Sequence, residues 1–255
     1  MKNVNKALLT PEILQEYVDI NPLETWEHFR DERREGYRQI KQQLTNDQRG
    51  LCAYCEIDLH IDTRRGLDDF RVEHFIPKSL PSPPNYALDW SNMLGVCHGG
   101  SQSSVCDSAR YSNKQEDHSC DVPKADHDWT GDILNPLNIP SSPRLFKFDE
   151  STGDIMVDAM TCPSALQHRA SETIRLLRLS APRLNNLRLP VFEMLNEKIQ
   201  ELATQGLEIE EAANLLAEEL IPEKSEMHLP AFFTSIRWYL GEAAESRLQS
   251  INYAG

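Results

Sequence analysis

The first 50 residues have the alternation of apolar and polar positions expected of helices, with many Glu, Arg and Gln residues. Thr10-Pro11-Glu12 marks a helix start, because proline is tolerated in the first turn. A second helix is predicted from about Leu23 to Leu44, and Thr45-x-x-Gln48 fits a short capping box. Residues 1–50 are therefore expected to form N-terminal helices.

Helical periodicity returns at Ser164, where Leu166, Ala170 and Ile174 follow one another at three to four residues. Pro182 is expected to break this helix. Further helices are predicted over 190–204, 208–220 and 229–249. Pro190 and Pro230 would then lie in first turns. Residues 164–255 are therefore expected to form a helical C-terminal region, with partner docking as a candidate role.

Residues 51–130 differ, because cysteines, histidines, glycines and short β-type runs replace the helical pattern. Residues 131–163 combine a proline-rich connector with a predicted hairpin, formed by Phe146-Lys-Phe148 and Ile155-Met-Val157. The pattern thus divides the chain into helices, a cysteine-rich module, a connector with a hairpin, and helices again. We expect an α+β fold that is mainly helical.

Composition limits the function classes. The 255 residues include 26 Lys and Arg against 40 Asp and Glu, a net charge of −14, which excludes a broadly basic nucleic-acid coat but not a local site. No apolar run approaches the roughly 20 residues of a membrane-spanning helix, and residues 1–9 lack the apolar core of a secretory signal. A cytoplasmic protein without membrane contact is expected.

Charge is distributed unevenly along the chain. Residues 169–188 contain five arginines and one acid, whereas residues 189–255 contain 4 basic and 12 acidic side chains. The arginine stripe could extend a nucleic-acid channel or could be an exposed helix face with snorkelling side chains. The acidic helices could dock on a basic partner or could be a solvated face. The sequence leaves both pairs of alternatives open.

Six cysteines are present, and most of them lie close together in the chain. Cys52-Ala-Tyr-Cys55 is a C-x-x-C pair, a spacing at which two thiolates can bind one tetrahedral ion. A redox pair would need a βαβ context, which the pattern does not predict. Cys97 and Cys120 could supply the other ligands, with Cys106 as competitor. We therefore predict structural zinc, and Cys162 is expected to be a core residue.

A second candidate site lies within this cysteine set. Glu73-His74 falls in a β-like apolar run that Pro77 ends. Adjacent side chains of a strand face opposite ways, but at a strand end an acid can bind a cation while the next histidine faces substrate. Asn92 follows, and then Cys97. The run His118-Ser-Cys-Asp-Val-Pro-Lys124 completes the set.

The order of these residues resembles the HNH endonuclease family, whose ββα-metal motif would cover residues 52–124 here. The resemblance implies a zinc-stabilised module in which Cys52, Cys55, Cys97 and Cys120 hold structural Zn²⁺. It implies His74 as general base and Glu73 as a ligand of catalytic Mg²⁺ or Mn²⁺. A neutral imidazole can accept a proton from water, and a divalent cation can neutralise charge on the scissile phosphate. Asn92 would orient the catalytic loop or coordinate the ion.

The chain departs from the family pattern at two points. Asp121 stands where the family usually has histidine, and aspartate is a good ligand for magnesium or manganese. Whether Asp121 or Asn92 completes the ligand set is left open. The 22 residues between Cys97 and Cys120 exceed the usual gap, and Cys106 opens a similar pattern. Cys120 is preferred because the lysine expected after it is present as Lys124. Lys78 and Lys124 are candidate phosphate contacts.

Further segments resemble a narrower family, the PtuB HNH subunits of Septu anti-phage systems, some of which accompany retrons. These segments are 72–78, 95–100, 118–124, 133–137 and the 146–157 hairpin. The resemblance implies a PtuA-like ATPase partner, in some systems a retron reverse transcriptase with its msDNA, and an effector that cleaves DNA or tRNA. The alternative is a catalytically inactive, zinc-stabilised nucleic-acid-binding or adaptor subunit, which the aspartate at position 121 motivates.

Overall fold

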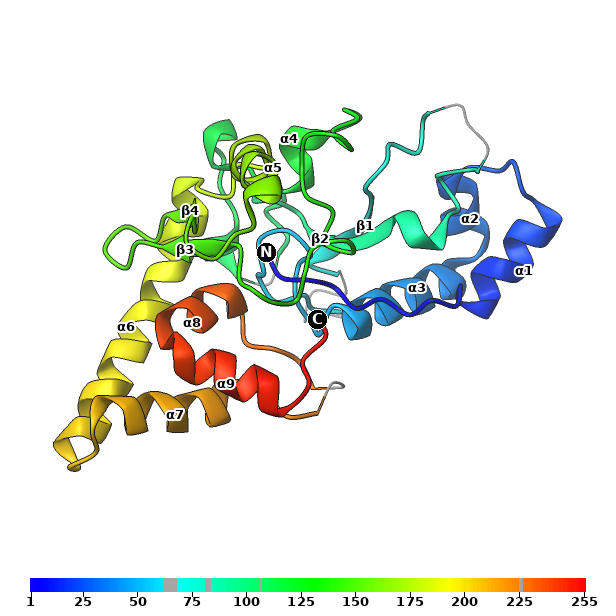
Figure 1. The fold of residues 1–255 in the computed structure, drawn as a ribbon. Coiled ribbons are helices and arrows are strands. Elements are labelled where there is room, and N and C mark those ends of the chain that lie inside the picture. The colour runs from blue at the N-terminus through cyan, green and yellow to red at the C-terminus, as the bar shows by residue number, and fades with distance from the viewer. Residues whose placement is uncertain (62–67, 81–83, 106, 225–226) are drawn as a thin grey trace.

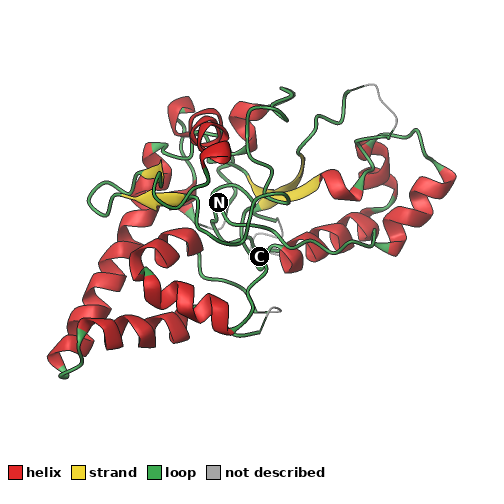
Figure 2. Ribbon diagram, viewed as in Figure 1, coloured by secondary structure: helices red, strands yellow, loops and turns green. Residues whose placement is uncertain are grey.

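A computed structural model describes residues 1–61, 68–80, 84–105, 107–224 and 227–255 (Figures 1 and 2). Short 3-10 turns cover Trp90–Asn92, Ser108–Arg110 and Gln115–Asp117. The helices and strands, in chain order, are α1 (Glu12–Ile20), α2 (Trp26–Glu32), α3 (Arg34–Asp47), β1 (Phe70–His74), β2 (Met93–Cys97), α4 (Asp121–Lys124), β3 (Phe146–Phe148), β4 (Ile155–Val157), α5 (Ser164–Leu176), α6 (Pro182–Thr204), α7 (Ile209–Leu220), α8 (Phe233–Leu240) and α9 (Glu242–Ser250). This order of elements agrees with the α+β class expected from the sequence.

The N-terminal helices correct two predictions. The single helix predicted over 23–44 is two helices, because the backbone leaves the helical region at Arg33, where φ is −114° and ψ is 56°. The predicted capping box is also wrong. Thr45 lies inside α3, where its hydroxyl donates to the carbonyl of Lys41 (2.9 Å), and Gln48 follows the helix end. The break lets α2 and α3 contribute buried side chains to one small core.

The central feature is an antiparallel hairpin of β1 and β2, in which Glu73 pairs with Leu94 and His74 with Met93. On one side, Val72 and Met93 join buried residues of α1, α2 and α3. On the other side, Leu94 and Val96 join a larger core that extends to the C-terminal helices. Figure 1 shows the hairpin between these two parts. The strands are thus fixed from both faces.

The hairpin predicted over residues 146–157 is confirmed, since β3 pairs antiparallel with β4. It packs on the C-terminal helices through aromatic side chains. The Phe148 ring centroid lies 6.3 Å from that of Phe192 on α6 and 6.0 Å from that of Trp238 on α8. Because these contacts join the connector to the last helices, the large core crosses the predicted segment boundaries at 131 and 164.

The C-terminal helices differ from the predicted bounds. Helix α5 already ends at Leu176, and Pro182 begins α6, while Pro190 lies inside α6, so the predicted start at 190 is wrong. Proline is tolerated at a first helical position, which explains the start at 182. The helix predicted over 229–249 is divided at Gly241, whose φ of 55° suits glycine, and Pro230 precedes it. Across the described ranges, no helix is both long and apolar enough to span a membrane.

Arginines of the stripe at residues 169–188 largely donate hydrogen bonds to other segments of the protein. Arg188 is 2% exposed and donates to the carbonyls of Gly153 (3.0 Å) and Leu179 (2.8 Å). Arg183 is buried and donates to the Ser119 hydroxyl (2.8 Å). These two arginines therefore serve neither of the roles considered from the sequence, because their guanidinium groups hold other segments in place.

Replacing Arg188 with methionine is expected to lower the free energy of unfolding by about 3 kcal/mol. The change keeps an unbranched apolar stem but removes the guanidinium group, which leaves two buried carbonyls without their charged donor. Burial lowers the pKa of Arg188 to about 10, so the wild-type group remains protonated at neutral pH. Urea unfolding measures the effect. Arg175→Met is the control, since Arg175 is exposed and forms a surface ion pair with Glu172, and the urea midpoint of this variant should equal that of wild type.

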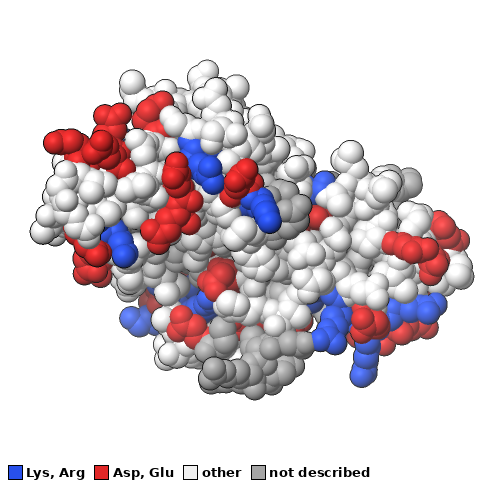
Figure 3. All heavy atoms as spheres, turned by 90° about the horizontal axis from the view of Figure 1, so that it is seen from below, with Lys and Arg blue, Asp and Glu red and all other residues white. Residues whose placement is uncertain are grey.

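Acidic side chains dominate the far end of the C-terminal region. Figure 3 shows them gathered over the end of the molecule formed by α6, α7 and α9. They include Glu208, Glu210, Glu211, Glu218 and Glu219 along α7 and its cap. The concentration of negative charge makes this end of the molecule unfavourable for contact with a polyanion.

Candidate functional site

Four cysteine sulfurs meet in one buried cluster. Cys52, Cys55, Cys97 and Cys120 place their sulfurs within 4.8 Å of one another. The sulfur of Cys97 lies 3.5 Å from that of Cys55 and 3.7 Å from that of Cys120. Four thiolates at about 2.3 Å from a tetrahedral zinc ion are about 3.8 Å apart, so the cluster fits zinc. Cys106, the competing ligand, lies outside the described residues, and Cys162 is buried in the core as expected.

The local backbone brings these cysteines together. The knuckle of residues 52–55 is tied to β2, because the Ala53 amide donates to the carbonyl of Gly95 (3.1 Å). The Gln48 side chain accepts from the Gly95 amide (2.6 Å) and donates to the Leu51 carbonyl (2.7 Å). Cys97 ends β2, and its amide donates to the sulfur of Cys52 (3.4 Å). Three of the four sulfurs are thus held by the hairpin and its knuckle.

Cys120 reaches the cluster from a different part of the fold. It precedes α4 with a φ of 62°, and its amide donates to the Leu177 carbonyl (2.9 Å) beyond α5. Gly99 has a φ of 59°, and a Cβ there would lie 2.2 Å from the Ser119 carbonyl oxygen. This close approach requires glycine. The C-terminal region therefore fixes the turn that delivers both Cys120 and Asp121.

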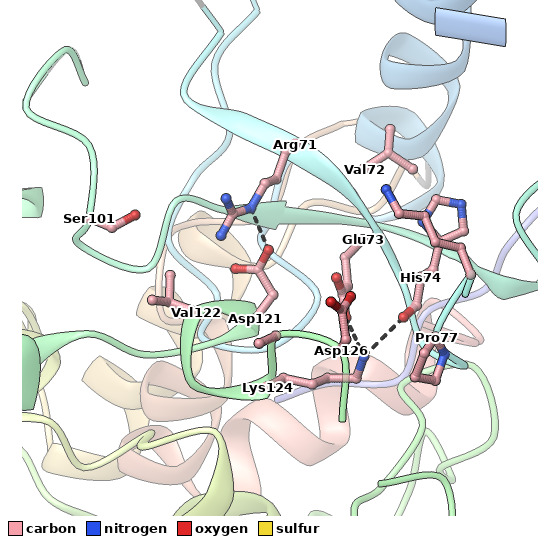
Figure 4. Close-up of a pocket in the computed structure, with 12 residues that line it drawn as sticks. Arg71, Val72, Glu73, His74, Pro77, Ser101, Asp121, Val122, Lys124 and Asp126 are labelled. Carbon is pink, nitrogen blue, oxygen red and sulfur yellow. Dashed lines mark hydrogen bonds and ion pairs between the residues drawn. The ribbon is translucent and has the colours of Figure 1, made fainter. Parts of the chain in front are cut away.

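A pocket of about 410 Å³ opens beside the cysteine cluster (Figure 4). Four residues of β1 line the pocket, namely Arg71, Val72, Glu73 and His74, and alternation along the strand points the Arg71 and Glu73 side chains the same way and that of Val72 the opposite way. Helix α4 supplies Asp121 and Lys124 from the opposite wall. The order of strand, strand and one-turn helix predicted from the sequence is confirmed, and it brings Glu73 and Asp121 into one pocket.

Cations accompany both carboxylates. Arg71 Nε forms an ion pair with Asp121 Oδ2, and Lys124 Nζ lies 2.8 Å from Glu73 Oε1. Burial raises the pKa of Glu73 to about 7, although Lys124 opposes the rise, and burial also raises the pKa of Asp121. Asp121 Oδ1 is buried and has no hydrogen-bond partner among the described residues. The protein's own cations and hydrogen-bond donors therefore do not fully satisfy the two acids. Two carboxylates in this state fit a site for a hard divalent cation.

His74 ends β1 as predicted, but its ring packs on the face of the strand opposite Glu73. It is 5% exposed, and its ring centroid lies 5.3 Å from that of Trp26 in an edge-on contact. His74 Nε2 lies 3.0 Å from the carbonyl oxygen of Ala87. Because a carbonyl only accepts, Nε2 carries the proton and Nδ1 keeps its lone pair. Burial lowers the pKa of His74 to about 4, so the ring is neutral.

Asn92 braces the loop between the two strands. Its Oδ1 accepts from the Ile76 amide (2.7 Å), and its Nδ2 donates to the carbonyls of Ile76 (2.8 Å) and Tyr86 (3.0 Å). It does not line the pocket that holds Glu73 and Asp121. Of the two roles left open by the sequence, these contacts favour orientation of the loop over coordination of an ion.

Replacing Asn92 with aspartate is expected to separate these roles. As a brace, aspartate cannot donate to the two carbonyls, so unfolding should become easier by about 3 kcal/mol, with no gain in Mn²⁺ affinity. As an ion ligand, aspartate should bind Mn²⁺ at least as tightly as asparagine. Thermal unfolding and Mn²⁺ titration measure both quantities. Tighter Mn²⁺ binding with unchanged stability would contradict the bracing role.

The two candidate phosphate contacts lie in different settings. Lys124 is 1% exposed, and its ammonium contacts Glu73 and donates to the His74 carbonyl (3.0 Å). Lys78 lies at the pocket edge, partly exposed, and pairs with Glu27 of α2. Lys78 is thus the more accessible of the two to a phosphate.

Arg71 is a pocket residue that the sequence prediction did not select. Its guanidinium neutralises Asp121 while part of the side chain remains exposed to the pocket. The sequence did contain the evidence for this position. Arg71 stands two residues before Glu73, and side chains at that spacing share a strand face.

Comparison with known proteins shows a relationship over most of the chain. No protein-family model matches the chain. The chain is 37% identical over 209 residues to an Escherichia coli protein named "Retron Ec83 putative HNH endonuclease". The matched segment covers 74% of this chain and 78% of that relative.

Proposed function

The chain belongs to the HNH endonuclease family, and we propose that it hydrolyses phosphodiester bonds of nucleic acid in the pocket between β1 and α4. The observation that carries the proposal is the convergence of the partly buried Glu73 carboxylate and the buried Asp121 carboxylate on that pocket. Glu73 comes from the strand and Asp121 from the helix that such a site requires. They would hold Mg²⁺ or Mn²⁺, which when bound neutralises charge on the scissile phosphate and stabilises the leaving oxygen.

The remaining roles follow from the contacts of each residue. His74 serves as general base, because the hydrogen bond to Ala87 fixes a neutral tautomer with a free lone pair on Nδ1. Asn92 holds the loop that carries Ala87 and Ile76 near the strand end. Lys78 contacts the phosphate backbone, and the positive charges of Arg71 and Lys124 oppose the rise in pKa that burial causes in Asp121 and Glu73.

The cysteine cluster is proposed to hold Zn²⁺ in a structural role. All four cysteines are buried, and four protein sulfurs leave no open coordination position for substrate. The ion would join the knuckle, the end of β2 and the start of α4. The zinc site would therefore set the distance between the elements that carry Glu73 and Asp121.

The relative named for a retron supports a wider proposal for this chain. We place it as the effector nuclease of an anti-phage system, acting with a PtuA-like ATPase and, in a retron, with a reverse transcriptase and its msDNA. The net charge of −14 and the acidic α6–α7 end favour a subunit that needs a basic partner to bind nucleic acid. DNA and tRNA are the candidate substrates.

Cleavage assays with matched variants test the proposal. The purified chain, alone and with its co-purifying partners, is incubated with plasmid DNA and with tRNA in Mg²⁺, Mn²⁺ or EDTA. Cleavage should require the cation and should be lost in Glu73→Ala and Asp121→Ala with zinc still bound. Cleavage by neither wild type nor variants, with partners present, would favour the inactive binding or adaptor subunit instead.

A further inference from the structure

An aromatic pair lies on the segment that leaves α4, immediately beyond the pocket. The ring centroids of His127 and Trp129 are 5.6 Å apart, and the angle between the two ring planes is 11°. The rings are therefore stacked with an offset. Trp129 is half-buried and packs against the large core, whereas His127 is exposed. The pair is thus anchored through one ring and accessible to solvent through the other.

The backbone fixes this pair beside the pocket. Ala125 and Asp126 line the pocket (Figure 4), and His127 is the next residue, with its Cα about 3.8 Å from that of Asp126. Ala125 has a φ of 45°, a strained conformation for a residue with a side chain. The amide of Ala125 donates to the Asp121 carbonyl (2.9 Å), and the amide of His127 donates to the Lys124 carbonyl (2.9 Å). The turn is therefore tied to the helix that supplies Asp121.

Helix α5 holds the other end of the segment. The guanidinium group of Arg169 donates to the carbonyls of Thr130 (3.1 Å) and Ile133. The Trp129 carbonyl accepts from the amides of Asp132 (2.9 Å) and Ile133 (3.0 Å). Because the segment is held at both ends, a flat ligand that stacks on the rings would have little chain to immobilise.

The charges beside the pair determine which part of a nucleotide can bind there. Asp126 and Asp128 flank His127, and both are exposed. Hydrogen bonds from Thr130 lower the pKa of Asp128, so this carboxylate is ionised at neutral pH. Acidic side chains disfavour a phosphate at this position, whereas an uncharged base can stack on an aromatic ring. Bases inside a duplex have their faces covered by neighbouring bases, so the base that binds must be unpaired and unstacked.

We propose that the His127–Trp129 pair is a stacking platform for an unpaired base next to the phosphate that is hydrolysed, so that the substrate is single-stranded nucleic acid or a single-stranded loop. Single-stranded DNA and RNA share this chemistry, because every base has a π-face. The inference rests on the proposed function, since the pocket must hold the phosphate for the platform to meet the adjacent base.

His127→Ala tests the platform. Short fluorescein-labelled single-stranded DNA, single-stranded RNA and duplex DNA are titrated, by fluorescence anisotropy, with the full chain and its co-purifying partners in EDTA, which prevents cleavage. Affinity for single strands should fall about 5-fold or more, the usual effect of losing one base stack, and affinity for the duplex should not change. A loss for only one kind of single strand supports the platform and identifies the sugar of the substrate. The melting temperature should stay the same, because His127 is exposed.

His127→Phe and His168→Ala are the matched variants. Phenylalanine keeps a flat ring without a charge, so affinity for single strands should stay within about 2-fold of that of wild type. His168 is exposed on α5 and does not line the pocket, so its replacement should have no effect. Wild-type affinity of His127→Ala for single strands, or equal losses for single strands and duplex, would overturn the inference. A loss in His127→Phe as large as that in His127→Ala would also overturn it.

Cleavage kinetics separate this inference from the proposed function. With Mg²⁺, His127→Ala should raise KM for a single-stranded substrate and leave kcat nearly unchanged, because stacking contributes to binding and not to the chemical step. If wild type and His127→Ala cleave single strands with equal KM, while Glu73→Ala does not cleave them, only the platform fails. If wild type with its partners neither binds nor cleaves nucleic acid, the proposed function fails, and the platform fails with it.

Discussion

Replacing His74 with glutamine is expected to reduce nucleic-acid cleavage by about 10²- to 10⁴-fold, the usual contribution of a general base. Glutamine has no basic nitrogen, yet its amide can donate to the Ala87 carbonyl, and its volume limits the cavity beside Trp26. The protein should therefore remain folded with zinc bound. Initial cleavage rates with Mg²⁺, far-ultraviolet circular dichroism and zinc content measure the three expectations.

His28→Gln is the matched control for this prediction. His28 Nδ1 lies 2.7 Å from the Tyr17 hydroxyl, but the residue does not line the pocket. The cleavage rate of His28→Gln should equal that of wild type. If His74→Gln also keeps the wild-type rate, His74 is a core histidine packed on Trp26, and another group must activate the attacking water.

Replacing Cys120 with serine is expected to release zinc and to lower the melting temperature by roughly 10 °C or more. Zinc binding to four cysteine or histidine ligands contributes about 10–16 kcal/mol in small zinc modules, comparable to the whole stability of a typical domain. Cys120 joins α4 to the hairpin, so its loss should also separate Asp121 from Glu73 and abolish cleavage. Metal analysis of the dialysed protein and differential scanning calorimetry measure the outcome.

Cys162→Ser is the control, because Cys162 is also buried but lies outside the cluster. It should keep full zinc content and lose only a little stability. Cys106→Ser completes the series. If Cys106→Ser releases zinc and Cys120→Ser retains it, the ligand set derived from the four clustered sulfurs is wrong.

The sequence predicted elements well where local pattern alone decides them. Both strands of the 146–157 hairpin and the end of β1 at His74 were predicted, because turn residues and proline mark them directly. Helix boundaries were less predictable. Nothing local distinguishes Arg33 from its helical neighbours, and the break there depends on how α2 and α3 pack on the β1–β2 hairpin.

The candidate site shows a similar limit. Residue order was enough to select Glu73 and Asp121, which the structure brings into one pocket, and the four cysteines that cluster. Spacing could not reveal that Arg183 and Arg188 point inward, because an arginine-rich helix has the same pattern whether it faces solvent or carbonyl groups. Residue spacing also could not show that both the oxygen and the nitrogen of the Asn92 side-chain amide form hydrogen bonds with the backbone.

The attachment of the Cys120 turn to Leu177 and Arg183 also determines when the active site can form during protein synthesis. Glu73 and Asp121 are translated early, but the segment that anchors the Cys120 turn follows more than fifty residues later. At about 5–20 residues per second, the ribosome needs several seconds to supply it. A nascent chain that already displays both acids therefore lacks a fixed α4, and nuclease activity should emerge only after the helical region has left the ribosome.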